Sequence, residues 1–246
     1  MDRLIEALRD EDAFERAHAA RFLGNLAPAA KAAVPALTEA LKDPAPLVRR
    51  RAALALGSLG PEGKVAVPAL IEALKGEPDP FHFERTDAAA ALGCIGPGAS
   101  AAVPALAEAL RDEFPSVRMC AAPALGRIGP GARPALPDLR KALRDKEWEV
   151  RARAAIALWR VGRETKEALP PLVEALKGKD RDDTGSVDSW TVRRVAGALG
   201  EMGPRAKEAV PALLPLVKDQ DWGVRRWTGQ ALKKIDPEAA KKAGVR

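Results

Sequence analysis

The sequence predicts an all-α fold, a right-handed solenoid (α-α superhelix) of about seven helical pairs. The first observation is the phrase AVPAL, which occurs at 33–37, 66–70, 102–106 and 209–213, with near-copies at 135–139 and 168–172. The second is its period, because successive prolines of the phrase lie 33, 36, 33, 33 and 41 residues apart, as in repeat arrays. The third is an earlier copy, DRLIEAL at 2–8, with Asp2 in place of the proline. We expect one domain over 1–246, with repeats starting near 2, 35, 68, 104, 137, 170 and 211.

Each repeat is predicted to begin with a first helix such as PALTEALKD, in which apolar residues recur at helical spacing. Proline is favoured in the first turn of a helix, because the N–H that it lacks has no intrahelical partner there. We therefore expect the recurring prolines to start first helices: Pro35, Pro68, Pro104, Pro137, Pro170 and Pro211.

A second helix is predicted to follow in each repeat, as in VRRRAALALGSLG, where small and large apolar residues share one face. Small alanines in the middle allow neighbouring helices to approach closely, and the larger residues fill the remaining space. A Gly-Pro pair ends this helix, because glycine accepts the left-handed conformation and proline cannot continue the helix. The pairs stand at 60–61, 96–97, 129–130 and 203–204.

A consensus of the form AVPALxxALKDxxxxVRxxAAxALGxLGP resembles a HEAT repeat, and more narrowly the bacterial HEAT-like repeats named after the phycobilisome lyases. The resemblance covers about the whole chain. It implies an armadillo-type solenoid whose second helices line a concave face, but this fold does not fix the function. Ankyrin and tetratricopeptide repeats are disfavoured, because the Thr-Pro-Leu-His signature and tyrosine are both missing.

An acidic residue closes most first helices and an arginine opens most second helices. The resemblance implies that these residues cap helices and connect neighbouring repeats, and an acid near a helix N-terminus suits both roles. We therefore interpret them as structural. The acids are Asp10, Asp43, Asp112, Asp145 and Asp219, and the arginines are Arg16, Arg49, Arg85, Arg118, Arg151 and Arg225.

The composition, with 47% hydrophobic and 30% charged residues, is that of a soluble chain that forms a core. No run of about 18 apolar residues and no secretory signal pattern is present, so we expect a cytoplasmic monomer that does not bind membranes. Residues 1–123 carry 14 Lys and Arg against 17 Asp and Glu, whereas residues 124–246 carry 26 against 17. An acidic partner is therefore expected to contact the second half.

The repeat pattern is interrupted in two places, at 76–85 and at 178–190, and function is more often found at such departures. The first loop carries Phe81 and Phe83, which either tuck under the loop or form an exposed knob that contacts a partner. The second loop partly fits a calcium-binding order of acids but has Thr191 where a glutamate is needed. These irregular loops favour a natural chain over an engineered array. Three tryptophans near second-helix starts are either hydrophobic staples or a stacking ladder: Trp148, Trp190 and Trp222.

Catalysis has little support. No established catalytic motif is present, and the two cysteines, Cys94 and Cys120, have no metal-binding spacing. The HEAT-repeat enzyme deoxyhypusine hydroxylase is excluded, because the sequence has no His-Glu dipeptide. Asp87 could act like the acid of HEAT-like DNA glycosylases, but an ion pair between Asp87 and an arginine is the favoured interpretation. We predict no catalytic, cofactor-binding or metal-binding residues.

The sequence therefore favours a non-catalytic binding or scaffolding protein with a concave surface for a protein or peptide. One alternative is a nucleic-acid binder that uses the basic face, and another is a lyase-type accessory subunit. The candidate partner-binding residues are Arg127, Arg153, Arg160, Arg194, Arg226, Trp227, Lys234, Phe81 and Phe83.

Overall fold

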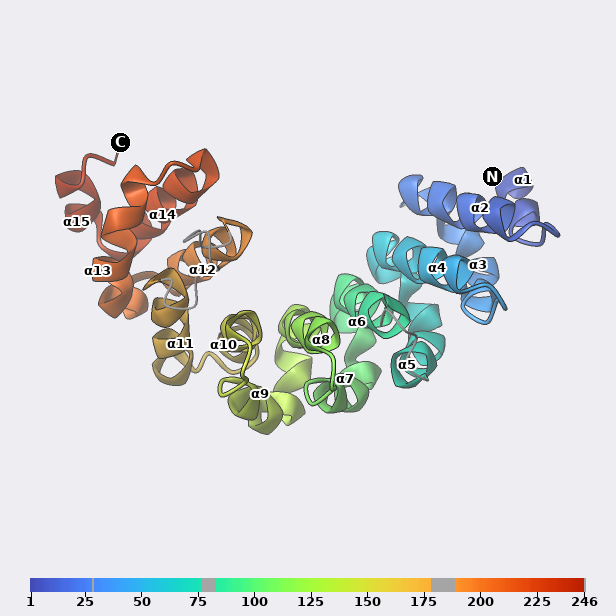
Figure 1. The fold of residues 1–246 in the computed structure, drawn as a ribbon, viewed down its shortest axis with the longest axis horizontal. Helices are drawn as coiled ribbons and strands as arrows, with labels where there is room; N and C mark the ends of the chain where they lie inside the picture. The colour runs from blue at the N-terminus through green and yellow to red at the C-terminus, as the bar shows by residue number, and fades with distance from the viewer. Residues whose placement is uncertain (28, 77–82, 178–188, 246) are drawn as a thin grey trace. The chain divides into compact units, whose positions relative to one another are not determined.

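The computed structural model describes residues 1–27, 29–76, 83–177 and 189–245, with the backbone alone described for Trp190. These residues form helices and contain no β-strand (Figure 1), which confirms the predicted all-α repeat fold. The contacts divide the chain into two compact units, Met1–Leu139 with Arg160–Gly162, and Arg140–Trp159 with Arg163–Arg246. The single domain over 1–246 stays a prediction.

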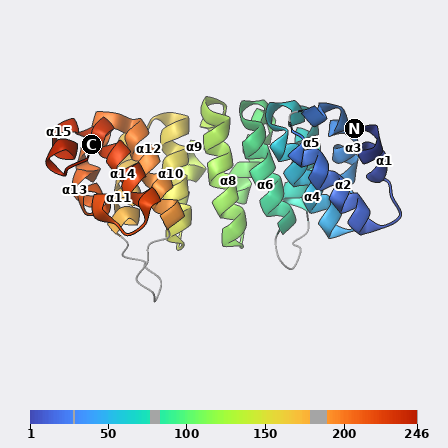
Figure 2. The same cartoon turned by 90° about the horizontal axis from the view of Figure 1, so that it is seen from above.

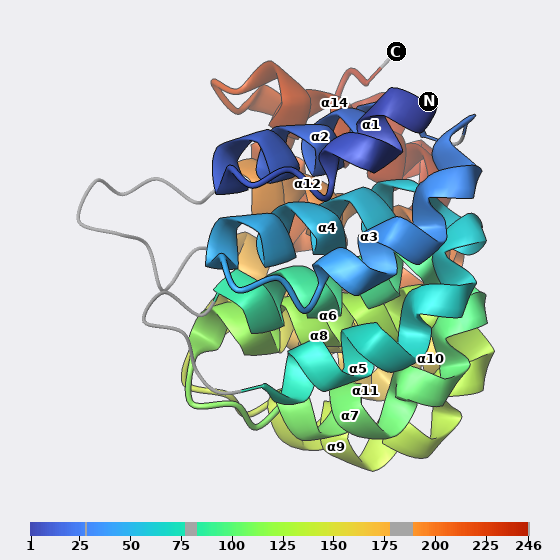
Figure 3. The same cartoon turned by 90° about the vertical axis from the view of Figure 1, so that its right-hand side faces the viewer.

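The first compact unit has two layers of helices. The second helices of successive repeats pack side by side, α2 against α4, α4 against α6 and α6 against α8 (Figures 2 and 3). The first helices form the other layer, each packed on the second helix of its own repeat. The helices are α1 (Asp2–Ala7), α2 (Ala13–Asn25), α3 (Val34–Ala40), α4 (Pro46–Ser58), α5 (Val67–Lys75), α6 (Phe83–Ile95), α7 (Val103–Ala109) and α8 (Pro115–Ile128).

The second compact unit repeats this pairing, with α11 packed on α12 and α12 packed on α14. A short additional helix, α15, packs on α14. Helix α9 (Leu136–Ala142) and helix α10 (Trp148–Gly162) contribute residues to both compact units. The remaining helices are α11 (Thr165–Lys177), α12 (Ser189–Met202), α13 (Val210–Leu213), α14 (Trp222–Ile235) and α15 (Pro237–Lys242).

The Gly-Pro pairs end second helices as predicted. Their glycines take positive φ angles of +58°, +71°, +74° and +61° at Gly60, Gly96, Gly129 and Gly203, a conformation that glycine adopts without steric cost. Each pair then opens a 3₁₀ segment that leads directly into the next first helix. These 3₁₀ segments were not predicted from the sequence.

The recurring proline occupies the first or second helical position of α3, α5, α7 and α13, which confirms its predicted place there. The prediction is wrong for Pro170, which lies inside α11 because that helix begins at Thr165. The preceding connection has no Gly-Pro pair. Instead Arg163 takes the left-handed conformation at φ 59°, and the helix restarts two residues later without a 3₁₀ segment.

The predicted second-helix face forms the core. Leu56, Leu92 and Leu125 have no exposed surface, and the alanines beside them are buried. The helices cross at glycine–alanine contacts, because a Cβ atom on Gly93 would lie 2.8 Å from the Cα of Ala124, which is closer than real Cβ atoms approach. Burying each leucine contributes about 2 kcal/mol to the stability of the fold.

The segment Phe83–Ala109 is long and apolar enough to meet a length-and-composition test for a membrane-spanning helix, contrary to the expectation from the sequence. In the structure this segment is α6, a 3₁₀ segment and α7, with a positive φ at Gly96 between them. Of its most apolar window, 61% is buried inside the protein. Packing between neighbouring repeats therefore explains its hydropathy.

Candidate interaction surfaces

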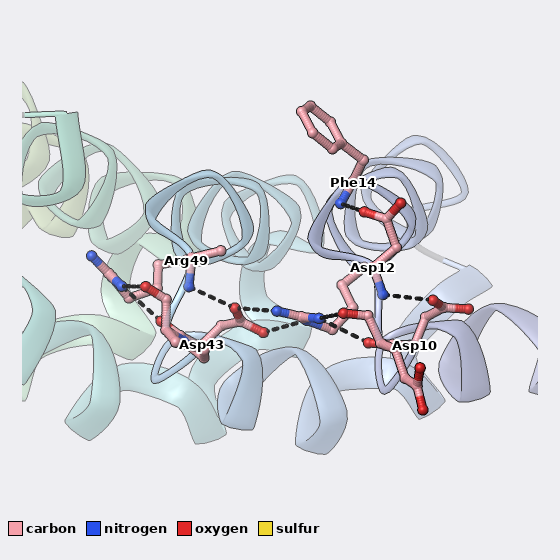
Figure 4. A network of polar contacts seen from close by, with 9 residues as sticks. Asp10, Asp12, Phe14, Asp43 and Arg49 are labelled. Carbon is pink, nitrogen blue, oxygen red and sulfur yellow. Dashed lines mark hydrogen bonds and ion pairs between the residues drawn. The ribbon is translucent and has the colours of Figure 1, made fainter.

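Aspartates after the first helices and arginines of the second helices form a row of polar contacts, here called the ladder, whose first part is drawn in Figure 4. Oδ1 of Asp43 accepts the N–H of Ala45 at 2.8 Å and so shapes its loop. Nη1 of Arg49 donates to the carbonyl oxygens of Asp43 and Pro44 at 2.7 and 2.9 Å. Nε and Nη2 of Arg16 donate to the carboxylate of Asp43 at 2.7 and 2.9 Å. These contacts fix the loop after α3 and connect it to the preceding repeat, as the structural interpretation predicted.

The hydrogen bonds from Arg16 hold the pKa of the Asp43 carboxyl below its usual value, although burial of the carboxylate opposes this shift. The same hydrogen bond raises the pKa of Arg16. Both side chains are charged at neutral pH, so they form a bidentate ion pair.

In the third repeat, which has the expanded loop, the arginine of the preceding repeat pairs with a glutamate and not with a loop aspartate. Arg49 donates through Nε and Nη2 to Glu84, in the first turn of α6. The next arginine, Arg85, donates to Asp112 at 2.6 Å. The ladder therefore continues through this repeat with a glutamate from the helix in place of a loop aspartate.

The acid considered for a glycosylase-like role has a structural partner. The carboxylate of Asp87 accepts a hydrogen bond from Nε of Arg50 at 3.0 Å, as the ion-pair interpretation predicted. The guanidinium of Arg50 also lies 3.8 Å from the centre of the Phe83 ring, which is 41% exposed. Phe83 thus packs against a neighbouring repeat and still presents part of its ring to solvent. Phe81 and the proposed ion-binding loop at 178–188 lie outside the described residues.

The candidate arginines differ in exposure. Arg127 in the last turn of α8 is exposed. Arg153, Arg160 and Arg194 are half-buried, and each already interacts with other groups. Because a side chain held by internal contacts offers less to a partner, these three are weaker contact candidates than exposed residues.

Helix α14 carries the densest group of exposed candidate residues. Trp227 is 44% exposed, and Arg226 and Lys234 are exposed as well. The ring of Trp227 lies against Gly197 of α12, where a Cβ atom would stand 3.4 Å from the ring. This is an ordinary van der Waals distance, so the ring packs closely over Gly197 and leaves room for a Cβ atom there.

Trp222 and Lys233 are also exposed on α14, although neither was among the partner-binding residues predicted from the sequence. Trp222 is 64% exposed, and the guanidinium of Arg226 lies 5.2 Å from the centre of its ring. This exposure argues against a buried staple at this helix start. We define the α14 face as the exposed set of two tryptophans, three cations and one amide: Trp222, Arg226, Trp227, Gln230, Lys233 and Lys234.

Within the described ranges, no three His, Cys, Asp or Glu side chains are grouped closely enough to hold a metal ion. Of the cysteines, Cys94 is exposed, Cys120 is half-buried, and both are free thiols.

Two family models match the sequence. The model described as HEAT repeats matches residues 1–93, 130–187 and 185–243, and the model described as HEAT repeat matches residues 102–132. No curated protein matches the sequence.

Several solved structures are similar to this chain. The complex of CpcE and CpcF of phycocyanin lyase from Nostoc sp. PCC7120 includes a chain with 27% identity and a TM-score of 0.68, over 98% of this chain and 91% of that chain. A designed armadillo repeat protein in complex with the peptide (KR)4 has 18% identity and a TM-score of 0.53, over 95% and 98%. A chain of the Kap95p–RanGDP complex has 20% identity and a TM-score of 0.56, over 94% of this chain and 35% of that chain.

Proposed function

Because the chain belongs to the HEAT-repeat family, we propose that it is a non-catalytic binding or scaffolding protein that presents its second helices to a protein or peptide partner. The helical repeat fold is typical of protein-binding scaffolds. Repeats that pack on their neighbours hold a row of side chains in fixed positions, so a partner is recognised with little reordering of the scaffold.

The α14 face is the observation that carries this proposal. Tryptophan and arginine are the residues that contribute most to binding energy at protein interfaces, and this face offers two exposed tryptophans together with Arg226. No acidic residue belongs to the face, so its charge is positive. We therefore propose that the partner is a protein or peptide with acidic side chains around an apolar anchor.

Pull-down from the native source tests the proposal with a triple variant, Arg226→Glu, Trp227→Ala and Lys234→Glu. We expect the partner to be lost, because the variant removes an anchor and reverses two charges. A matched control, Lys42→Glu with Lys64→Glu, changes the same number of exposed lysine or arginine charges in the first compact unit and is expected to keep the partner. An identical set of captured proteins for all three chains would contradict the proposal.

Nucleic acid is the second candidate partner, because exposed aromatic rings beside cations also bind single strands. This function predicts that a labelled single-stranded oligonucleotide binds and that its affinity falls steeply with salt. No binding to DNA or RNA at about 50 mM salt would remove this candidate.

A lyase-type accessory subunit is the third candidate, supported by the 27% identity to a chain of the phycocyanin lyase complex over nearly the whole length. It predicts binding to phycocyanin or to its unmodified subunits. Titration of these subunits into the protein, followed by calorimetry, checks the prediction. The absence of binding would leave the general scaffold function intact.

A further inference from the structure

The ladder leaves Arg225 and two aspartates, Asp10 and Asp219, without a charged counterpart among the described residues, and of the two aspartates only Asp10 is exposed. In its most complete rung, Nε and Nη2 of Arg16 donate to both oxygens of Asp43 in the next repeat. Arg49 donates through the same two atoms to Glu84, also in the next repeat. Each such rung therefore runs from the arginine of one repeat to an acid of the following repeat.

Arg225 in α14 is the arginine without a counterpart. Its Nη1 donates to the carbonyl oxygens of Asp219 and Gln220 at 2.7 and 2.9 Å, so its guanidinium is anchored to its own loop as in the other repeats. Within the described part of the chain, no carboxylate accepts from Nε or Nη2. The Arg225 side chain lines a pocket of about 420 Å³, which is also lined by Trp222, Arg226 and Lys233. Among the described residues, no acid lines this pocket.

Asp10 is the exposed aspartate without a counterpart. Its Oδ1 accepts the N–H of Asp12 at 2.8 Å, which repeats the loop geometry of Asp43 and Ala45. No lysine or arginine side chain in the described ranges pairs with its carboxylate. The exposed acids Glu11, Asp12 and Glu15 follow it in sequence, so carboxylates gather at this edge, whereas the Arg225 pocket carries cations.

Exposed aromatic residues occur next to both groups. Phe14 and Phe22 on α2 are 66% and 48% exposed, and Trp222 lines the Arg225 pocket. The outer repeats of a solenoid normally present polar surfaces for solubility. Large exposed aromatic side chains depart from this rule and are typical of surfaces that another molecule covers.

We propose that these two surfaces bind each other between copies of this chain, with the Asp10 carboxylate of one copy accepting from Nε and Nη2 of Arg225 in a second copy. The contact reproduces the rung between Arg16 and Asp43. Because the two surfaces differ, the contact is heterologous, and each copy keeps one unused surface of each kind for further copies.

Packing limits the strength of this contact. Within the chain, Gly24 lets α4 approach α2 so closely that a Cβ atom on it would lie 2.9 Å from the Cα of Ala55. When the second helices are aligned, Phe22 stands where α4 has Ala55, and Lys233 stands where α4 has Gly57. Two copies therefore cannot pack as closely as two repeats, and the association is weak and reversible.

Charge-reversal variants of the full chain test the proposal by sedimentation velocity. The wild-type protein is expected to associate progressively as its concentration rises toward about 0.5 mM at about 50 mM salt. Asp10→Arg and Arg225→Asp are each expected to stay monomeric. An equimolar mixture of the two variants should associate again, because one contact between them regains the wild-type pair and the other contact pairs the two reversed charges.

A milder variant at Asp10 protects the test against loss of folding at Arg225, and two control substitutions test its specificity. Asp10→Asn keeps the acceptor for the Asp12 N–H but removes the charge, and it should weaken association about tenfold. The control substitutions Glu39→Arg and Arg205→Asp make the same charge changes at exposed sites and should leave association unchanged. A monomeric wild type over this concentration range, or association unaffected by Asp10→Asn and Asp10→Arg, would overturn the proposal.

Discussion

The arginines of the second helices have both a local and an inter-repeat role. An arginine of the second helix contacts two partners at once, its own loop through Nη1 and the next repeat through Nε and Nη2, as Arg49 does. The sequence predicted this role because the residues recur at a fixed position. It did not predict that Glu84 replaces the loop aspartate, because the exchange depends on where the expanded loop places the start of α6.

Loss of one arginine of the ladder is expected to destabilise the protein. Arg16→Ala should lower the free energy of unfolding by about 2 kcal/mol, because the largely buried carboxylate of Asp43 then loses two charge-assisted hydrogen bonds. Urea denaturation followed by circular dichroism measures this change. Arg111→Ala serves as the control, since this exposed arginine pairs with Asp138 at the surface and should matter by less than about 1 kcal/mol.

Acid is expected to remove the same contribution. The hydrogen bonds from Arg16 lower the folded-state pKa of Asp43 below its value in the unfolded chain. Its contribution to stability is therefore complete above the unfolded-state pKa and is lost as the pH falls through the lowered folded-state pKa. Thermal unfolding from pH 7 to pH 3 should show a smaller acid-induced fall of Tm in Asp43→Asn than in the wild type. Parallel curves would contradict this assignment.

At the scale of helices, regular packing made the second helices predictable, because buried alanine and leucine recur at fixed spacing in α4, α6 and α8. The first helices were less predictable. A 3₁₀ segment and an α-helix share residue preferences, so the sequence did not show where one passes into the other. Ile156 lies between the candidate residues Arg153 and Arg160 of α10 and is buried, which the spacing of residues alone does not show, because it carries no information on the surroundings of a position.

The glycine–alanine crossings predict a sharp position dependence along α6. Gly93→Leu should reduce the free energy of unfolding by about 2 kcal/mol or more, because its side chain would push against the backbone of α8 at Ala124. Cys94→Leu, at the next and exposed position, is the matched control and should change stability by less than about 0.5 kcal/mol. Chemical denaturation of both variants checks the difference.

At the scale of the whole molecule, charge and exposure supply the functional information that the repeat does not. The excess of basic residues in the second half was visible in the sequence, and Arg226, Trp227 and Lys234 were identified as candidates from it. Exposure of Trp222 and the unmatched state of Arg225 were not visible, because both depend on three-dimensional surroundings. The repeating motif is explained by the packing of the helices. Residues that depart from the motif are therefore the most informative about binding partners.

Salt dependence of self-association follows from the charges at the two proposed surfaces. Raising the salt concentration from about 50 mM to 0.5 M should weaken association, because the Debye length shortens to a few ångströms and exposed charges are screened. Sedimentation velocity at both concentrations measures the effect. Stronger association at high salt would instead indicate that the exposed phenylalanines and Trp222 drive it without the ion pair.

The direction of the ladder has a consequence for how chains of this kind change length. In the rungs from Arg16 to Asp43 and from Arg85 to Asp112, one repeat supplies the arginine and the next repeat supplies the acid, so duplication or deletion of one such repeat would keep these pairs matched. A partial insertion separates an arginine from its acid and survives only with a substitute, as Glu84 provides after the expanded loop. We therefore expect such chains to gain or lose whole repeats during evolution. A substitute acid such as Glu84 marks a place where only part of a repeat was inserted.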